Sequence, residues 1–171
     1  MNLDKNQKAL FLTDIENRLD SILQEVTNIP AENMLTIQSY DSIISHPYGD
    51  IMRSVIIAIY QENVKEIFVV GTKDKKTAGN VLTQLDSIKD KIQTLDYLFE
   101  NCMPEFSGGT VDGWLNGKEN DSNDIVKSVN IIRNHPLVPS HVSVRGLIIN
   151  KNDGKFSIVE VPTDKTVSNL T

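Results

Sequence analysis

The chain is poor in cysteine and contains no long hydrophobic run. Cys102 is the only cysteine among 171 residues, so no disulfide can form within the chain. A lone thiol is typical of proteins kept in a reducing compartment. The longest apolar stretch, Val55 to Tyr60, is far shorter than the roughly 20 residues that cross a bilayer, and the first residues do not resemble a secretory signal peptide. These absences favour a cytoplasmic protein without membrane insertion.

Basic residues are outnumbered by acidic ones. The chain has 17 lysines and arginines against 23 aspartates and glutamates, which gives a formal net charge of −6. A nucleic-acid partner would require a basic face, so this class of function is not expected. Hydrophobic residues (39%) and charged residues (23%) are present in the proportions of an ordinary globular protein. We expect a single domain over residues 1–171, with a core over about 9–161 and a flexible tail over 162–171.

The hydrophobic pattern alternates between strands and helices along the chain. Apolar and β-branched runs predict strands at 9–12, 34–38, 67–71, 142–149 and 156–161. Helical spacing predicts helices at 14–26, 50–61, 81–95 and 125–132. The polar, glycine-rich stretch 106–124 is expected to be mostly loop, anchored by Trp114. Strands separated by helices indicate an α/β fold, with about four parallel strands, one antiparallel edge strand and flanking helices.

The expected helix at 50–61 is apolar on nearly every side. Its apolar residues are Ile51, Met52, Val55, Ile56, Ile59 and Tyr60. A helix that is hydrophobic on two sides is usually buried on two sides. One side can pack on the sheet, so we expect the other to contact a second subunit, in a homodimer or a larger homo-oligomer.

Two regions of the sequence resemble the beta class of carbonic anhydrases. The first is ISHPYGDIMRS, from Ile44 to Ser54, with EIFVVG ending at Gly71; the second is NHPLVP, from Asn134, with VSVRGLII and DGK ending at Lys155. Trp114 also stands where many members of that family carry a tryptophan. The likeness covers residues 10–161. It implies the fold of that family, whose members hydrate CO2 reversibly to bicarbonate.

The resemblance also places the family's two zinc-binding motifs on this chain. The Cys-x-Asp-x-Arg motif falls on Asp14, Glu16 and Arg18, and the histidine and cysteine of the Gly-His-x-x-Cys motif fall on Thr72 and Lys75. Zinc in this family is held by two thiolates and one imidazole, none of which is present at these positions. Threonine is a poor zinc ligand, and an ammonium group repels a divalent cation. The resemblance therefore implies a pseudoenzyme without a metal cofactor.

The replacements suggest what fills the family's zinc site in this chain. Lys75 can place an ammonium group near the metal position, opposite the carboxylate of Asp14. Glu16 and Arg18 can form the carboxylate–guanidinium pair of the family motif, and Thr72 adds a hydroxyl group. A buried charge requires a partner of opposite sign, so we expect an ion-pair network in which Lys75 substitutes for the metal.

Other reactive side chains are expected to be structural. His46 and His135 lie in His-Pro loops that match structural segments of the family, and His141 precedes a strand. Cys102 is a lone thiol, which is more often a partly buried small residue than a nucleophile.

Three functions remain open at this point. The first is a zinc-free carbonic anhydrase-like protein that acts as a binding, regulatory or structural partner, linked to CO2 or bicarbonate handling. The second is an active carbonic anhydrase with an atypical or absent metal, holding water between Glu16, Thr72 and Arg18. The third is a module that binds a small anion through Arg18 and Lys75. The sequence does not identify a protein partner.

Overall fold

The computed structural model describes residues 6–14, 19–40, 44, 46–72, 85–102, 110–116, 121–152 and 155–161. These residues form two compact units, one within Met1–Lys73 and Ser122–Thr171 and the other within Asp74–Asp121. The expected tail over 162–171 lies outside the described residues, and the single domain over 1–171 stays a prediction. No helix among the described residues is long and apolar enough to cross a membrane.

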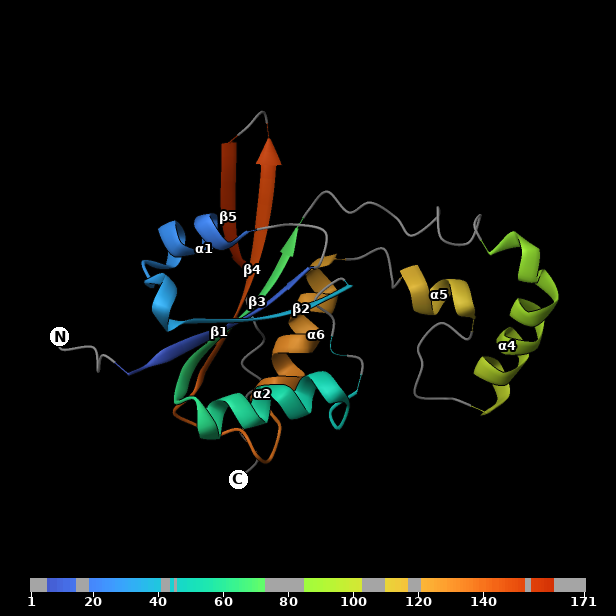
Figure 1. The fold of residues 1–171 in the computed structure, drawn as a ribbon, viewed down its shortest axis with the longest axis horizontal. Helices are drawn as coiled ribbons and strands as arrows, with labels where there is room; N and C mark the ends of the chain where they lie inside the picture. Colours follow the sequence, from blue (N-terminus) through green and yellow to red (C-terminus); the bar gives the residue numbers. More distant parts are fainter. Residues whose placement is uncertain are drawn as a thin grey trace, which may run out of the picture. The chain divides into compact units, whose positions relative to one another are not determined.

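A five-stranded sheet forms the centre of the first unit (Figure 1). Its strand order is β2-β1-β3-β4-β5, in which β1 to β4 are parallel and β5 runs antiparallel to β4. This arrangement confirms the predicted fold class. The strands are β1 (Lys8–Asp14), β2 (Met34–Ser39), β3 (Val64–Thr72), β4 (Ser143–Asn152) and β5 (Lys155–Val161).

The helices follow the predicted order with three corrections. The first unit holds α1 (Asp20–Thr27), η1 (Ala31–Asn33), α2 (Asp50–Gln61) and most of α6 (Asp121–Arg133). The second unit holds η3 (Asp86–Ile88), α4 (Lys89–Cys102) and α5 (Val111–Asn116). The prediction of a helix from residue 14 is wrong, because Asp14 pairs with Ser39 in the sheet and α1 begins only at Asp20.

The other two corrections concern the second unit. The helix expected over 81–95 begins, within the described residues, as a 3-10 turn at Asp86 and continues as α4 to Cys102. The stretch expected to be mostly loop contains α5. The carboxylate of Asp96 accepts a hydrogen bond from the backbone N–H of Val111 at 2.7 Å, at the start of α5. This contact joins residues 15 positions apart, so it leaves no local signal in the sequence.

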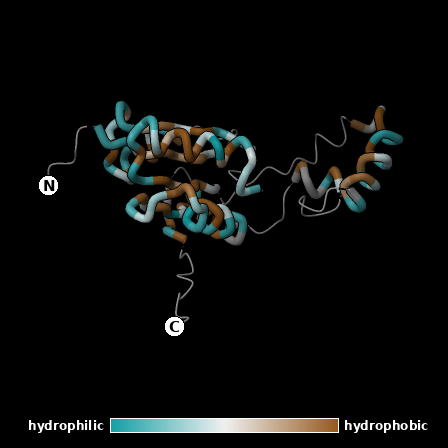
Figure 2. The backbone as a smooth tube through the Cα atoms, turned by 90° about the horizontal axis from the view of Figure 1, so that it is seen from below, coloured by the Kyte–Doolittle hydropathy of each residue, from teal (hydrophilic) through white to brown (hydrophobic). Residues whose placement is uncertain are grey.

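Helices cover both faces of the sheet (Figures 1 and 2). Successive side chains of a strand point to opposite faces, so each strand contributes to two hydrophobic layers. The layer beneath α1 contains Ala9, Phe11, Leu19, Leu23, Phe68, Val70, Leu147 and Ile149. The layer beneath α2 and α6 includes Leu10, Leu12, Met52, Val55, Ile59, Ile67, Val69, Ile125, Val129 and Val144.

Two glycines allow α6 to lie directly on the sheet. A Cβ atom added at Gly71 of β3 would lie 2.2 Å from Cδ1 of Ile125, and one added at Gly146 of β4 would lie 2.7 Å from Cγ2 of the same residue. Real Cβ atoms essentially never approach other heavy atoms so closely. The side chain of any residue other than glycine at position 71 or 146 would therefore overlap Ile125.

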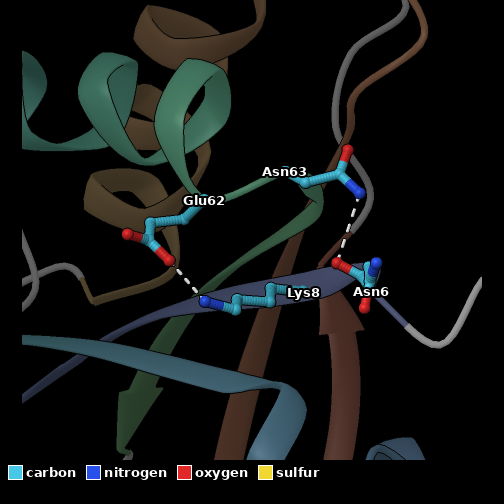
Figure 3. A network of polar contacts seen from close by, with 4 residues as sticks. All are labelled: Asn6, Lys8, Glu62 and Asn63. Carbon is cyan, nitrogen blue, oxygen red and sulfur yellow. Dashed lines mark hydrogen bonds and ion pairs between the residues drawn. The ribbon is translucent and has the colours of Figure 1, made fainter.

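The turn between α2 and β3 is fastened to the start of β1 (Figure 3). Asn63 adopts the left-handed backbone conformation, with φ of 55°. Its side-chain amide donates a hydrogen bond to the carbonyl of Asn6 at 3.2 Å, and its own carbonyl accepts one from the N–H of Lys8 at 3.3 Å. The ammonium group of Lys8 also pairs with the carboxylate of Glu62.

We expect Asn63→Ala to lower the free energy of unfolding by about 1–2 kcal/mol. Alanine is strained in the left-handed backbone conformation, and it lacks the side-chain hydrogen bond to the carbonyl of Asn6. Urea unfolding followed by circular dichroism measures this change. Asn63→Gly is the matched control, since glycine relieves the strain and loses only the side-chain bond. If the alanine variant is as stable as the wild type, the turn does not have this role.

Candidate functional site

The candidate site lies at the carboxyl edge of the sheet, between β1 and β3. The chain passes from β1 to β2 on one side of it and then returns to β3 on the other side. Open α/β sheets commonly bind ligands beyond the strand ends at such a reversal. Asp14 is the last residue of β1 and Thr72 is the last residue of β3. The parallel register, which pairs Leu12 with Val69, brings both residues to this edge.

The polar residues at this edge are buried. Thr13, Asp14 and Thr72 are 2%, 5% and 9% exposed, and the apolar core residues 9–12 of β1 and 67–70 of β3 precede them. The hydroxyl oxygen of Thr13 is also buried and has no hydrogen-bond partner among the described residues. A buried polar atom without a partner costs about 1–3 kcal/mol, so this hydroxyl is an unfavourable group at the end of β1.

Sequence reasoning missed Thr13. The available signal was a hydroxyl group that directly follows the apolar run of Leu10, Phe11 and Leu12. A threonine in a buried strand usually satisfies its hydroxyl within the fold, so only the structure distinguishes it from an ordinary strand residue.

Comparison with known proteins identifies the family. No protein-family model matches the chain. The provisionally named carbonic anhydrase-like protein YbcF of Bacillus subtilis is 72% identical over 167 residues, which cover 97% of this chain and 94% of that protein. This chain is a divergent member of the beta-class carbonic anhydrase family. A second protein of the same organism, YvdA, provisionally named a carbonic anhydrase, is 29% identical over 90% of this chain and 77% of its own length.

Solved structures share the fold. The beta-carbonic anhydrase isoform I of Trichomonas vaginalis superposes with a TM-score of 0.65 and 20% identity, covering 94% of this chain and 87% of that one. The carbonic anhydrase of Streptococcus mutans gives a TM-score of 0.61 and 17% identity, covering 92% and 82%. At these identities the likeness concerns the fold alone.

The described part of the site does not fit the family's zinc. Beta-class carbonic anhydrases bind the metal with thiolates and an imidazole, and at two of the positions that the resemblance assigns to these ligands Asp14 and Thr72 carry a carboxylate and a hydroxyl group. Among the residues that the structure describes, no three His, Cys, Asp or Glu side chains form a group that could hold a metal ion. No step of metal-dependent catalysis can be derived from these two side chains.

Three residues of the predicted site cannot be placed. Glu16, Arg18 and Lys75 lie outside the described residues. The structure thus brings Asp14 and Thr72 to one edge of the sheet, but the ion-pair network and the anion site stay predictions.

Two of the histidines serve local turns. The Nδ1 atom of His46 accepts a hydrogen bond from the N–H of Tyr48 at 3.0 Å, and Nδ1 of His135 accepts one from the N–H of Leu137 at 3.2 Å. The ring of Tyr48 packs edge-on against His135, with centroids 5.1 Å apart. Both His-Pro turns therefore use the imidazole to satisfy a backbone N–H group, which supports a structural role for these histidines.

Proposed function

We propose that this protein is a zinc-free carbonic anhydrase-like protein without CO2 hydration activity, acting as a binding or regulatory partner in the handling of CO2 or bicarbonate in the cytoplasm. The observation that supports the proposal is the burial of Asp14 and Thr72 at the ends of adjacent strands. The resemblance assigns these two residues to positions at which the family carries metal ligands.

The chemistry of the replacements is not that of an active zinc site whose reactivity has only been modified. Zinc makes hydroxide available at neutral pH by lowering the pKa of its bound water to about 7. A hydroxyl and a carboxylate activate water far less well, so an enzyme that lost the metal would lose most of its rate. Lys75, at the third ligand position, would add a positive charge that opposes a metal cation and balances Asp14.

We also propose that the protein forms a homo-oligomer through the outer face of α2. Met52, Val55 and Ile59 of this helix are buried, whereas Ile57 and Tyr60 are exposed on its other side. The hydroxyl of Tyr60 donates a hydrogen bond to the carbonyl of Leu137 at 2.7 Å, which holds the tyrosine in place beside another exposed apolar residue. A related fold, from Sordaria macrospora with a TM-score of 0.51, is described as a tetrameric beta-carbonic anhydrase.

Metal content and CO2 hydration test the proposed function together. Untagged protein purified without chelators is expected to contain less than about a tenth of an equivalent of zinc per chain, because two thiolates and an imidazole are missing. Stopped-flow measurements are expected to show no CO2 hydration above the uncatalysed rate. A zinc-containing beta-class enzyme prepared in the same way is the positive control.

The contrary outcomes identify the alternative functions. Nearly one equivalent of zinc, with a rate that a chelator abolishes, would mean that other ligands have taken over and that the protein is an active carbonic anhydrase. A rate that survives the chelator would point to metal-free hydration with water held among Glu16, Arg18 and Thr72. Either result overturns the proposal of an inactive protein.

A further inference from the structure

The two His-Pro turns of the first unit contact each other through the ring of Tyr48. In each turn the imidazole accepts a hydrogen bond from a backbone N–H group, that of Tyr48 for His46 and that of Leu137 for His135. The centroid of the Tyr48 ring lies 5.1 Å from that of His135 and 6.3 Å from that of His46. The turns differ in burial, because His135 is only 4% exposed whereas His46 is exposed.

The buried imidazole of His135 fits its turn only as the neutral ring. Its Nδ1 atom accepts the N–H of Leu137 at 3.2 Å, so the one proton of the neutral ring is on Nε2. Nε2 is buried without a hydrogen-bond partner among the described residues, none of whose carboxylates forms an ion pair with this ring. A second proton, on Nδ1, would point at the N–H of Leu137 and leave a buried positive charge with two donors and no acceptor. The charged ring therefore requires the turn to open.

The same turn holds part of the outer face of α2. The carbonyl of Leu137 accepts a hydrogen bond from the hydroxyl of Tyr60 at 2.7 Å. Leu137 and Tyr60 are 53% and 63% exposed, so this bond fixes two exposed side chains beside each other. The backbone of Leu137 thus connects the imidazole of His135 on one side with the surface of α2 on the other.

The surrounding charged groups do not compensate a charge on His135. The described titratable side chains of the neighbouring elements are Tyr48 and His46 from the other turn, Asp50, Arg53 and Tyr60 from α2, and Asp124, Lys127 and Arg133 from α6. Asp50 is exposed, and Asp124 lies at the other end of α6, about 16 Å away along the helix axis. His46 would itself become positive in acid. The nearby acids are therefore too exposed or too distant to hold an imidazolium in the turn.

We propose that His135 is a pH-sensitive switch for the outer face of α2. When a proton from solvent binds Nδ1, the hydrogen bond to the N–H of Leu137 breaks, the turn opens and Tyr60 loses its acceptor. Its regulatory meaning rests on the proposed function, in which this face contacts a second copy of the chain and the protein takes part in CO2 or bicarbonate handling. Dissolved CO2 releases a proton when it forms bicarbonate, so the switch would respond to the same chemistry. The local opening of the turn depends on neither proposal.

Nuclear magnetic resonance between about pH 8 and pH 5 tests the local switch. We expect the amide signal of Leu137 and the ring signals of Tyr60 to shift together with the titration of His135. In His135→Asn these signals should stay constant, because an asparagine oxygen can accept the same N–H group and takes up no proton. His46→Asn is the matched control, since it removes the exposed histidine of the equivalent turn and should leave the response of Leu137 unchanged.

Three results overturn the inference. His135 could titrate without any change at Leu137 and Tyr60, it could stay neutral over the whole range, or the response could persist in His135→Asn. The first two are read from the wild-type protein alone, so the test does not depend on the folding of a variant.

Sedimentation separates the switch from the contact that it is proposed to control. The wild type is expected to lose about half of its molar mass between about pH 7.5 and pH 5.5, whereas His135→Asn keeps its mass. Ile57→Glu places a charge on the outer face of α2 and should give the smaller mass at both pH values. A wild-type mass that does not change with pH rejects the control of assembly by His135. A wild-type monomer at both pH values rejects the α2 contact itself, while the resonance measurement still decides whether the turn opens.

Discussion

Gly146→Ala is expected to lower the free energy of unfolding by about 2–3 kcal/mol, because the added methyl group would overlap a side chain of α6. The added Cβ would lie 2.7 Å from Cγ2 of Ile125 and 3.4 Å from Cγ2 of Val129. The Cγ2 of an isoleucine in a helix has little freedom to move, because a β-branched side chain has essentially one rotamer there. The helix α6 must therefore lift away from β4.

Gly71→Ala is expected to be destabilising for a different reason. Its Cβ would meet Cδ1 of Ile125 at 2.2 Å, and this atom is the flexible end of the side chain. Ile125→Val removes Cδ1 but keeps Cγ2, so it should offset the loss of stability in Gly71→Ala and leave that of Gly146→Ala unchanged. A double-mutant cycle, with urea unfolding of each variant, measures these two couplings.

Gly49→Ala is the matched control for both glycines. A Cβ at Gly49 would approach only the carbonyl oxygen and Cβ of His46, at 3.5 and 3.7 Å, and the backbone φ of −80° suits any residue. We expect a change within about 0.5 kcal/mol. If Gly146→Ala is equally mild, α6 does not rest on the sheet as described.

Restoring the family's ligands is expected to produce the largest functional change. The triple variant Asp14→Cys, Thr72→His and Lys75→Cys supplies two thiolates and one imidazole at the three positions. Zinc should rise from less than about a tenth to about one equivalent per chain, because this donor set binds the metal strongly. Metal analysis after dialysis measures the change, and CO2 hydration that a chelator abolishes would show that the bound zinc is reactive.

Two variants make this result specific. The double variant Asp14→Cys and Lys75→Cys lacks the imidazole and should hold the metal far less tightly. Thr72→His alone should bind none, since it provides only one strong ligand. If the triple variant also fails to bind zinc while remaining folded, the ligand positions are assigned wrongly or the loops that carry them have diverged, and the proposed origin of the metal-free state is contradicted.

Local patterns alone were sufficient for much of the fold. The helix at 50–61 was predicted with the bounds that α2 has, because its apolar residues recur at helical spacing after Gly49. The strands were found because β-branched runs in a parallel sheet are apolar throughout. The antiparallel β5 at the edge was predicted from the alternation of strands with helices and from the hairpin between β4 and β5, whereas the strand order β2-β1-β3-β4-β5 came only from the structure.

The candidate site was predicted in part. Asp14 and Thr72 were chosen by resemblance to a family motif, and the structure places them at the ends of adjacent strands. The burial of Thr13, and the absence of a hydrogen-bond partner for its hydroxyl among the described residues, could not be predicted. Both properties depend on what surrounds the strand end in space rather than on its neighbours in the chain.

The sequence by itself determined the α/β class and the parallel sheet, because periodicity is a property of neighbouring residues, and the resemblance of its motifs indicated the family. Tertiary structure decided the rest. The helix α5 begins where a carboxylate from α4 accepts the hydrogen bond of Val111. Gly71 and Gly146 are required because Ile125 approaches them from α6. In both cases the stabilising contact joins segments that are distant along the chain, and its energy exists only once they have been brought together.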